Sequence, residues 1–278
     1  MESWARFLAA AGLLVLLGAT STVAMVGYAM GVILVLGSQY LFFRKIVPKN
    51  VTEADNGRNW SEQIWKYSWP FASWGIFTWA QQASGRWALG LLTTTQEVGL
   101  FAVLFQLGYY PMSMATEMAM QFFAPIFYQR AGDASDSRRN ANVTNLSWRL
   151  TNLALGGTCA AFLLAFLFHT QIFRIFVAKE YASVSHLLPW MMLAGGLFAA
   201  GQTISLNLMS QMKTRTMAMA KIITALLGVI LNFAGAYWYG TAGIVISGVL
   251  FSVLYVLWMV LLSRTAVEGP VRAPRNSI

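Results

Sequence analysis

Residues 67–92 read YSWPFASWGIFTWAQQASGRWALGLL, a stretch apolar and aromatic enough to lie in a lipid bilayer. Its second half nevertheless contains two glutamines, a serine and an arginine, ending at Arg86. Polar side chains are costly among membrane helices, so they mark function or a polar cavity more often there than elsewhere. The stretch therefore predicts a membrane-spanning helix with one polar face.

The composition of the whole chain is typical of a multi-span membrane protein. Of its 278 residues, 57% are hydrophobic and only 10% are charged, whereas a typical soluble domain has roughly a quarter charged residues. The net charge of +9 does not indicate nucleic-acid binding, because the charges lie in short gaps between apolar runs. That arrangement is typical of loops at the cytoplasmic face of a membrane.

Apolar runs of about 20 residues each predict eight membrane-spanning helices. The first two form a tight hairpin within residues 7–43, with the turn at GATST (18–22), and the other six are expected at 67–92, 98–128, 146–169, 184–209, 216–239 and 243–263. The expected fold is therefore all-α and polytopic. It comprises a helical hairpin (1–45), a cytoplasmic linker (46–66), a six-helix transmembrane lobe (67–264) and a cytoplasmic tail (265–278).

Lysine and arginine are abundant in every second gap between the predicted spans. The rich gaps and the tail contain Arg44, Lys45, Lys49, Arg58 and Lys66, then Arg130, Arg138 and Arg139, then Lys213 and Arg215, and finally Arg264, Arg272 and Arg275. The alternate gaps are poor: TTTQE and YWYGTAG have no basic residue, and the third has Arg174 and Lys179. Because cytoplasmic loops carry the excess of positive charge, both termini are predicted to be cytoplasmic.

The span at residues 98–128 carries a stripe of polar side chains. Gln106, Tyr110, Ser113, Glu117 and Gln121 follow one another at intervals of four, three, four and four, which places them on one helical face. Two interpretations are open. The stripe lines a water-filled path, in which Glu117 binds a cation or a proton, or it joins helices together, with Glu117 neutral or paired.

The span at 67–92 repeats this pattern, since Trp74, Thr78, Gln81 or Gln82, and Arg86 can share a face. The guanidinium of Arg86 suits a diphosphate, because its planar donors match phosphate oxygens in pairs. In the alternative interpretation, Arg86 extends its long side chain to the membrane surface.

Polar groups in the later spans are weaker candidates. Lys221 begins the span at 216–239 and is expected to anchor that helix at the interface, and the remaining candidates are Gln202, Ser205, Asn207 and Asn232. The glycines at 195, 196 and 201 are expected to permit close helix packing.

Motifs of soluble enzymes are missing from the sequence, which has no phosphate-binding glycine loop, nucleophile elbow or metal-binding cluster. Neither a cofactor nor a metal site is expected. A membrane enzyme of glycan assembly usually has catalytic groups in a large external loop, whereas the external gaps here are short, so catalysis is not expected.

Several segments of the chain resemble Wzx-type polysaccharide flippases of the multidrug/oligosaccharidyl-lipid/polysaccharide exporter superfamily. Residues 67–133 resemble the seventh and eighth helices of that family, residues 173–202 its following loop and tenth helix, and residues 231–250 the junction of its last two helices. The matching positions are Tyr67, Pro70, Arg86, Leu89, Gly90, Val98, Gly99, Phe101 and Pro125. Gly85 departs from the pattern, because the family commonly has Asp beside the arginine.

The resemblance implies a flippase that moves undecaprenyl-diphosphate-linked oligosaccharide across the cytoplasmic membrane for the synthesis of O-antigen, capsule or exopolysaccharide. Arg86 would contact the phosphates, and the cavity would be lined by Gln82, Gln106, Glu117 and Gln121. The coupling ion, H⁺ or Na⁺, is left open. Residues 67–264 would form the complete second lobe and residues 1–45 the last two helices of the first. Several interpretations of the other four helices are open: the chain is a fragment, its start is misassigned, it is a reduced relative, or a partner chain or an oligomer completes the missing lobe.

Two alternatives come from different functional classes. A drug or cation antiporter of the same superfamily would depend on Glu117 and would not act on glycans. A membrane glycan polymerase or ligase would need catalytic residues in an external loop, where Arg174, Lys179 and Glu180 are the charged candidates.

Overall fold

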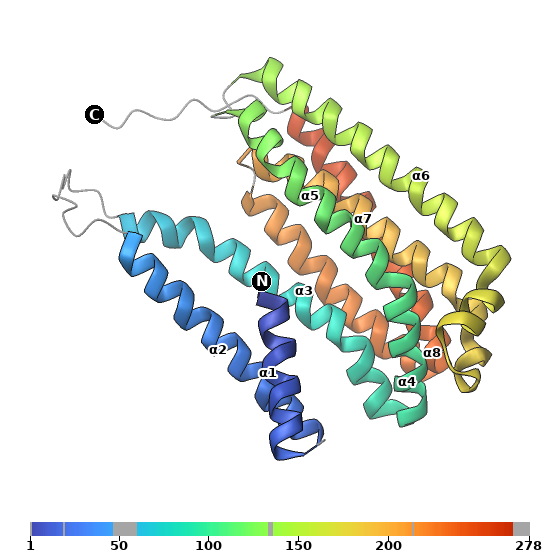
Figure 1. Ribbon diagram of the computed structural model, residues 1–278. Helices are drawn as coiled ribbons and strands as arrows, with labels where there is room; N and C mark the ends of the chain where they lie inside the picture. The colour runs from blue at the N-terminus through green and yellow to red at the C-terminus, as the bar shows by residue number, and fades with distance from the viewer. Residues whose placement is uncertain (1, 19, 47–59, 133–135, 213, 269–278) are drawn as a thin grey trace. The chain divides into compact units, whose positions relative to one another are not determined.

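The computed structural model describes residues 2–18, 20–46, 60–132, 136–212 and 214–268. Most of the predicted linker (47–59) and of the predicted tail (269–278) therefore lies outside the described residues. Within the described part, every regular element is a helix (Figure 1). Five of these helices are long and apolar enough to cross a membrane, namely Ser21–Ile46, Thr95–Ala131, Ser137–Phe176, Lys179–Ser210 and Thr214–Arg264. An all-α membrane protein is thus confirmed, whereas the count of eight spans stays a prediction.

The chain divides into two compact units, Met1–Trp60 and Ser61–Ile278. In the first unit, α1 (Glu2–Leu17) and α2 (Ser21–Ile46) form the predicted hairpin. The turn begins at Gly18, whose φ of +99° is a conformation that glycine adopts readily. Gly27 and Gly31 let the two helices approach closely, because a Cβ at Gly27 would lie 2.6 Å from the Cα of Ala10.

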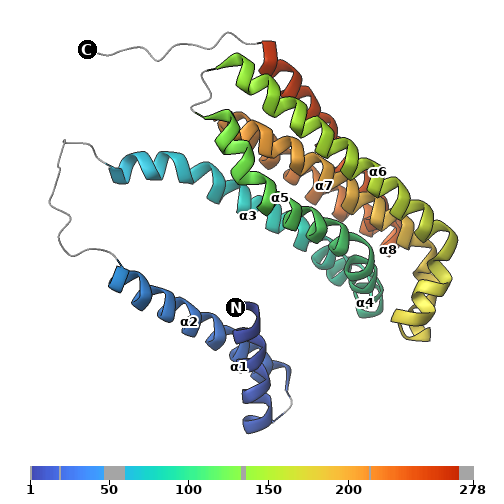
Figure 2. The ribbon, with the colours of Figure 1, turned by 45° about the horizontal axis from the view of Figure 1, so that its top comes forward.

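The second unit is a bundle built around α7 (Leu188–Ser210), as Figures 1 and 2 show. It also contains α3 (Trp60–Leu92), α4 (Thr95–Leu104), the π-helix η1 (Phe105–Tyr109), α5 (Tyr110–Ala131), α6 (Ser137–Phe176), the 3₁₀-helix η2 (Lys179–Leu187) and α8 (Thr214–Glu268). α7 packs against α5, α6 and α8. It is therefore buried on most sides, which fits its many small residues, including the three glycines predicted to permit close packing. A Cβ at Gly195 would lie 2.7 Å from the carbonyl oxygen of Tyr109, and one at Gly196 would lie 2.7 Å from the Cβ of Thr158.

α4, η1 and α5 form one continuous helical rod with a π-helical turn in the middle. Pro111 lies in the first turn of α5, one residue after the end of this π-turn. Because proline has no N–H and its ring collides with the carbonyl four residues earlier, a regular α-helix cannot pass through it undisturbed. The wider π-turn at Phe105–Tyr109 accommodates this disturbance, as π-turns in long helices commonly do.

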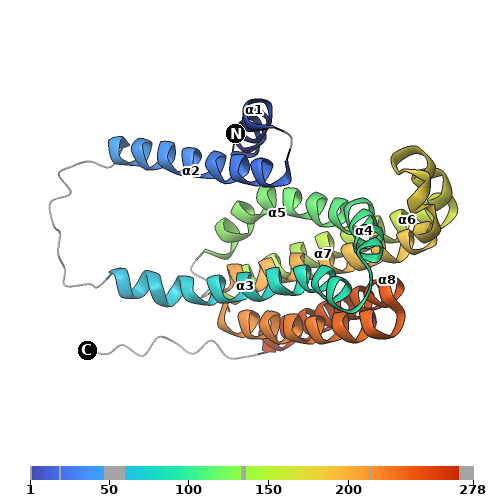
Figure 3. The same cartoon turned by 90° about the horizontal axis from the view of Figure 1, so that it is seen from below.

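α8 consists of two antiparallel helices joined at Gly240, whose φ of 54° and ψ of −133° are not helical (Figure 3). The two halves correspond to the segments predicted at 216–239 and 243–263. Gly235 and Gly243 face each other just beside the reversal, with no room for a Cβ on either. The second half is anchored by Glu97, whose Oε2 accepts hydrogen bonds from the backbone N–H of Thr241 at 2.7 Å and from its hydroxyl.

Contacts between helix ends show which loops of the second unit lie at the same end of the bundle. At one end, Gln211 after α7 donates a 3.1 Å hydrogen bond to Thr144 near the start of α6. At the other end, Glu97 contacts Thr241, and α4 packs against η2. Among the described residues of the second unit, the helix ends that flank the α5–α6 and α7–α8 connections, both rich in lysine and arginine, therefore lie at one end. The start of α4, η2 and the reversal at Gly240 lie at the other. This grouping is what the alternation of charge along the sequence requires of a helical bundle that crosses a membrane.

Candidate functional site

Matching faces of α3 and α8 form a buried polar seam. On α3, Trp74, Thr78, Gln81, Gly85 and Ala88 recur at intervals of four, three, four and three, so they lie on one face. On α8, the facing residues recur at helical intervals too, and they are Lys221, Thr224, Ala225, Gly228 and Asn232. Contact between the faces is close, since a Cβ at Gly228 would lie 2.7 Å from the Cγ of Gln81.

Lys221 lies inside the bundle rather than at its surface. Its side chain is only 4% exposed, and its Nζ lies 3.8 Å from the ring centroid of Trp74. The same Nζ donates a 2.9 Å hydrogen bond to the Oε1 of Gln202 on α7. The ammonium group is thus held by an aromatic face and an amide oxygen, two groups that attract a cation without carrying a charge.

The expectation that Lys221 anchors α8 at the membrane interface is therefore wrong. A lysine at the beginning of a span usually extends toward the interface, but here Trp74 and Gln202 hold it in the interior. The spacing of Lys221 with Thr224, Gly228 and Asn232 was a signal in the sequence, because it puts the lysine on the face of α8 that has small and polar residues.

A second polar group lies further along the same seam. Asn232 is buried, and its side-chain amide donates hydrogen bonds to the Oγ of Ser84 at 2.8 Å and to the carbonyl oxygen of Gln81 at 3.3 Å. Gln81 is itself only 6% exposed, and its Oε1 has no hydrogen-bond partner among the described residues. Because a buried polar atom without a partner is costly, this amide oxygen is free to accept a bond from a water molecule or another small donor.

Gln81 and Asn232 line a cavity of about 30 Å³ together with Gln82 and several apolar side chains, among them Phe101, Phe105 and Met191. A cavity of this volume is large enough for a water molecule. A smaller cavity of about 10 Å³ lies beside Lys221 and is lined by Thr78, Gln202 and Tyr255, among others.

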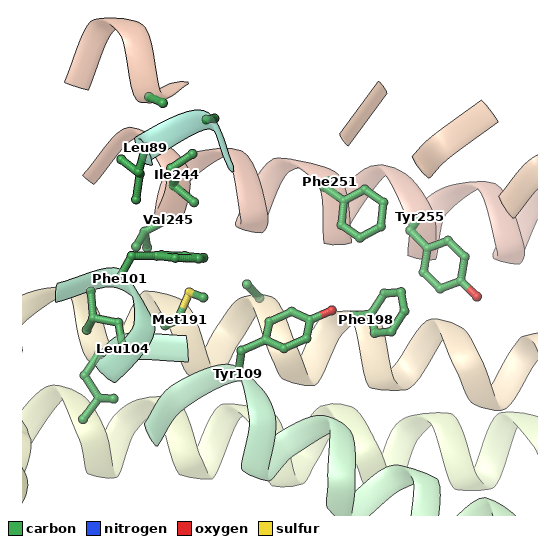
Figure 4. Packing of buried hydrophobic residues seen from close by; sticks show 14 of the residues in the cluster. Leu89, Phe101, Leu104, Tyr109, Met191, Phe198, Ile244, Val245, Phe251 and Tyr255 are labelled. Atoms are coloured by element: carbon green, nitrogen blue, oxygen red, sulfur yellow. The ribbon is translucent and has the colours of Figure 1, made fainter. Parts of the chain in front are cut away.

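An aromatic cluster separates the two polar groups. Figure 4 shows Tyr109 pointing toward Phe198 of α7, with Phe251 and Tyr255 of α8 on the opposite side. The ring centroids of Phe198 and Tyr255 are 5.1 Å apart, and those of Tyr109 and Phe198 are 6.0 Å apart. Phe251 lines both cavities. Along the seam, the aromatic cluster therefore lies between the polar group at Lys221 and the polar group at Asn232.

The predicted site residues of α3 have different surroundings. Gln82 is half-buried and lines the larger cavity. Arg86 is exposed, and its guanidinium lies 5.4 Å from the ring centroid of Phe105, in the range of a cation–π contact. Gly85 is buried. A Cβ there would lie 3.1 Å from Phe101 and 3.2 Å from Ile244, so a larger side chain at this position would require these neighbours to move.

The polar stripe of the fourth predicted span lies apart from these cavities. Ser113 is buried, and its hydroxyl donates to the carbonyl oxygen of Tyr110 at 3.0 Å. The other four side chains are exposed on the second unit, namely Gln106, Tyr110, Glu117 and Gln121. The structure thus does not bring Gln106, Glu117 and Gln121 together with Gln82 in one enclosed pocket.

Comparisons of the chain with protein-family models, with curated proteins and with solved structures found no match. Within the described residues, there is also no group of three or more His, Cys, Asp or Glu side chains that would hold a metal ion. The side chains of the seam and of the exposed stripe are therefore the basis for assigning a function.

Proposed function

We propose that the chain is a membrane flippase, or part of one, that moves undecaprenyl-diphosphate-linked oligosaccharide from the inner to the outer leaflet of the cytoplasmic membrane. One structural observation supports the sequence resemblance. Gln106, Glu117 and Gln121 are exposed along Thr95–Ala131, a helix long and apolar enough to span a membrane. A carboxylate facing lipid is costly, whereas one facing a water-filled path is not. The stripe therefore favours a helix that lines a route for a polar cargo.

In the proposed mechanism, no bond is made or broken. The exposed guanidinium of Arg86 would contact the diphosphate, because its paired donors match phosphate oxygens. The amides of Gln82, Gln106 and Gln121 would exchange hydrogen bonds with sugar hydroxyls, and Glu117 would bind H⁺ or Na⁺ as the coupling ion. Two helical lobes would rock about the central site, so that it opens to one leaflet at a time.

A drug or cation antiporter is the second candidate, and Glu117 is the residue that favours it. An antiporter would lose activity with Glu117→Gln and would keep it with Arg86→Ala, whereas the proposed flippase depends on both side chains. A glycan polymerase or ligase, the third candidate, would show itself by short glycans when the gene is deleted.

Cysteine labelling tests whether the stripe faces water. In a Cys159→Ser background, cysteines at positions 106, 117 and 121 are expected to react with a membrane-impermeant, hydrophilic thiol reagent. Matched controls at Phe122 and Leu163, which are exposed apolar positions, should react slowly because they face lipid. Equal rates at stripe and control positions would contradict a water-filled path.

Substrate protection then connects the path to the cargo. Added undecaprenyl-diphosphate-linked oligosaccharide is expected to slow the labelling at position 117, and undecaprenol alone is not. Labelling that is unaffected by the glycolipid but slowed by a hydrophobic cation would favour the antiporter over the flippase.

A further inference from the structure

Outside the seam, a polar concavity lies between the end of α5 and the beginning of α6. It has a volume of about 660 Å³ and is lined by Gln129, Arg130, Arg139, Asn142, Asn145, Leu146 and Arg149. On α6, its residues recur at intervals of three and four, so they form one continuous face of the helix. We call this concavity the arginine cleft.

The arginine cleft contains three guanidinium groups and no carboxylate in its lining. Arg130, Arg139 and Arg149 are exposed, and none of them has an ion-pair partner within the described residues. The nearest described carboxylate in sequence, Asp136, accepts hydrogen bonds from the backbone N–H groups of Arg138 and Arg139 at 2.8 and 3.4 Å, and so caps α6. Three like charges around one concavity repel each other, and an anion between them relieves that repulsion.

Amide side chains complete the lining with neutral donors and acceptors. Gln129, Asn142 and Asn145 each supply an NH₂ group. Guanidinium groups bind phosphate oxygens in pairs, and neutral amides donate to the oxygens that remain. The chemistry of the lining therefore fits a phosphate or a diphosphate better than a carboxylate, which has fewer oxygens to satisfy.

The positions of the cleft arginines along α6 show where the cleft lies relative to the membrane surface. Residues 150–173 contain no Asp, Glu, Lys or Arg, and at about 1.5 Å per residue they span about 36 Å, enough for the hydrocarbon core of a bilayer. Arg149 therefore lies at the edge of the apolar segment, and Arg139 lies about 15 Å further out. That length exceeds one headgroup layer, which is about 5–8 Å thick, so the cleft reaches from the hydrocarbon boundary to beyond the phosphates.

We propose that the arginine cleft binds the phosphate or diphosphate headgroup of a membrane lipid. The lipid would place its phosphate at Arg149, where the apolar segment begins, and extend its headgroup outward toward Arg139. A membrane phospholipid and a lipid-linked diphosphate have this chemistry in common. The proposal needs only that the second unit spans a membrane, so it does not depend on the proposed transport.

Lipid titration of the purified full chain in detergent tests the proposal. The probes are cardiolipin, phosphatidylglycerol and undecaprenyl diphosphate, with phosphatidylcholine as the neutral control, and binding is measured by native mass spectrometry. The cleft variant is Arg139→Gln/Arg149→Gln. The matched control is Arg215→Gln/Arg264→Gln, which removes two other exposed arginines at the arginine- and lysine-rich end.

Each arginine removed from the cleft is expected to weaken binding of the anionic lipid about fivefold, and the pair about 25-fold, since basic residues near a membrane surface contribute comparably. The control variant should bind like the wild type. The preferred probe identifies the source: a preference for undecaprenyl diphosphate indicates a carrier lipid, and a preference for cardiolipin or phosphatidylglycerol indicates a structural phospholipid.

Two results would overturn the proposal. One is equal binding of every anionic lipid by wild-type and cleft variant. The other is binding of inorganic pyrophosphate as tightly as the lipids, with the same dependence on the two arginines, because the ligand would then be soluble. Should the double variant fail to fold, Asn142→Asp tests the same point, since it adds a carboxylate to the cleft at an exposed position and is expected to weaken lipid binding about fivefold.

Discussion

Replacing Lys221 with methionine tests how its buried ammonium group contributes to the stability of the seam. The substitution keeps a long, flexible side chain and removes only the charge and its donors. The wild-type ammonium contacts the ring of Trp74 at 3.8 Å and the Oε1 of Gln202 at 2.9 Å. We expect Lys221→Met to fold with nearly unchanged stability.

The expected change in the free energy of unfolding on Lys221→Met is the difference between stabilising and destabilising contributions. A desolvated cation–π contact stabilises by about 2 kcal/mol, and a hydrogen bond from a charged group by about 1.5–3 kcal/mol. Against this sum stands the burial of one ammonium, which costs several kcal/mol after relaxation. The two sides nearly cancel, so Lys221→Met should change the free energy of unfolding by less than about 2 kcal/mol.

Replacing Gln202, the acceptor for Lys221, is expected to destabilise the protein more than replacing Lys221 itself. Gln202→Leu leaves the buried ammonium without its acceptor and should destabilise the protein by about 1.5–3 kcal/mol. In a Lys221→Met background the same change should be close to neutral, because no ammonium remains to be satisfied.

Thermal unfolding in detergent measures all three variants, with Lys179→Met as the control at an exposed lysine. For a unit of this size, 1 kcal/mol corresponds to about 2–4 °C in Tm, so Gln202→Leu alone should lower Tm by about 3–12 °C. Additive losses of stability in the double variant would mean that Lys221 and Gln202 do not interact, which would contradict this prediction.

Three further substitutions test the packing of the second unit by thermal unfolding. Gly196→Val should destabilise the protein by about 1–3 kcal/mol, because a Cβ at this position overlaps Thr158. Adding Thr158→Gly should partly restore the stability, and no such rescue is expected if the two helices lie further apart. Glu97→Ala should cost about 1–2 kcal/mol because it removes the acceptor for Thr241, and an unchanged Tm would mean that Glu97 does not anchor the second half of α8. Gly85→Asp should lower the stability by about 1–3 kcal/mol, and more than Gly85→Ala does, because it places a carboxylate against a buried aromatic ring. An unchanged Tm for Gly85→Asp would show that the side chains around this position can move apart.

Local signals in the sequence mark the places where the chain reverses or its helix is disturbed. Gly18 and Gly240 mark reversals of the chain, and each has a positive φ that only glycine adopts at little cost. The π-turn at Phe105–Tyr109 precedes Pro111 by one residue, and a proline inside a long helix is a local signal of such a disturbance. These features depend on one or two residues, so they can be derived without knowledge of the tertiary packing.

The interior of the bundle was harder to predict, because its contacts join residues far apart in the sequence. Lys221 is buried only because Trp74 and Gln202 lie beside it, and periodicity alone does not choose between burial and the interface. Likewise, the polar face of α3 runs through Gln81 toward Asn232, whereas Arg86 contacts the ring of Phe105. The sequence alone does not show which residues of α3 face α8, because this depends on where α8 packs.

For the exposed stripe on α4–α5, the spacing in the sequence did indicate the arrangement of the side chains. Its spacing indicated a shared face, and Gln106, Glu117 and Gln121 are all exposed. What covers that face is set by groups outside the described second unit, whether water, cargo or other helices. Its role therefore has to be established by experiment.

Leaflet localisation of the lipid-linked oligosaccharide tests the proposed transport most directly. The gene is deleted in its host, and the fraction of glycolipid accessible from outside is measured before and after the chain is restored. We expect completed units to accumulate in the inner leaflet of the deletion strain. They should reach the outer leaflet when wild-type protein is supplied, but not when Arg86→Ala is supplied. Normal delivery to the outer leaflet in the deletion strain would contradict the assignment as a flippase.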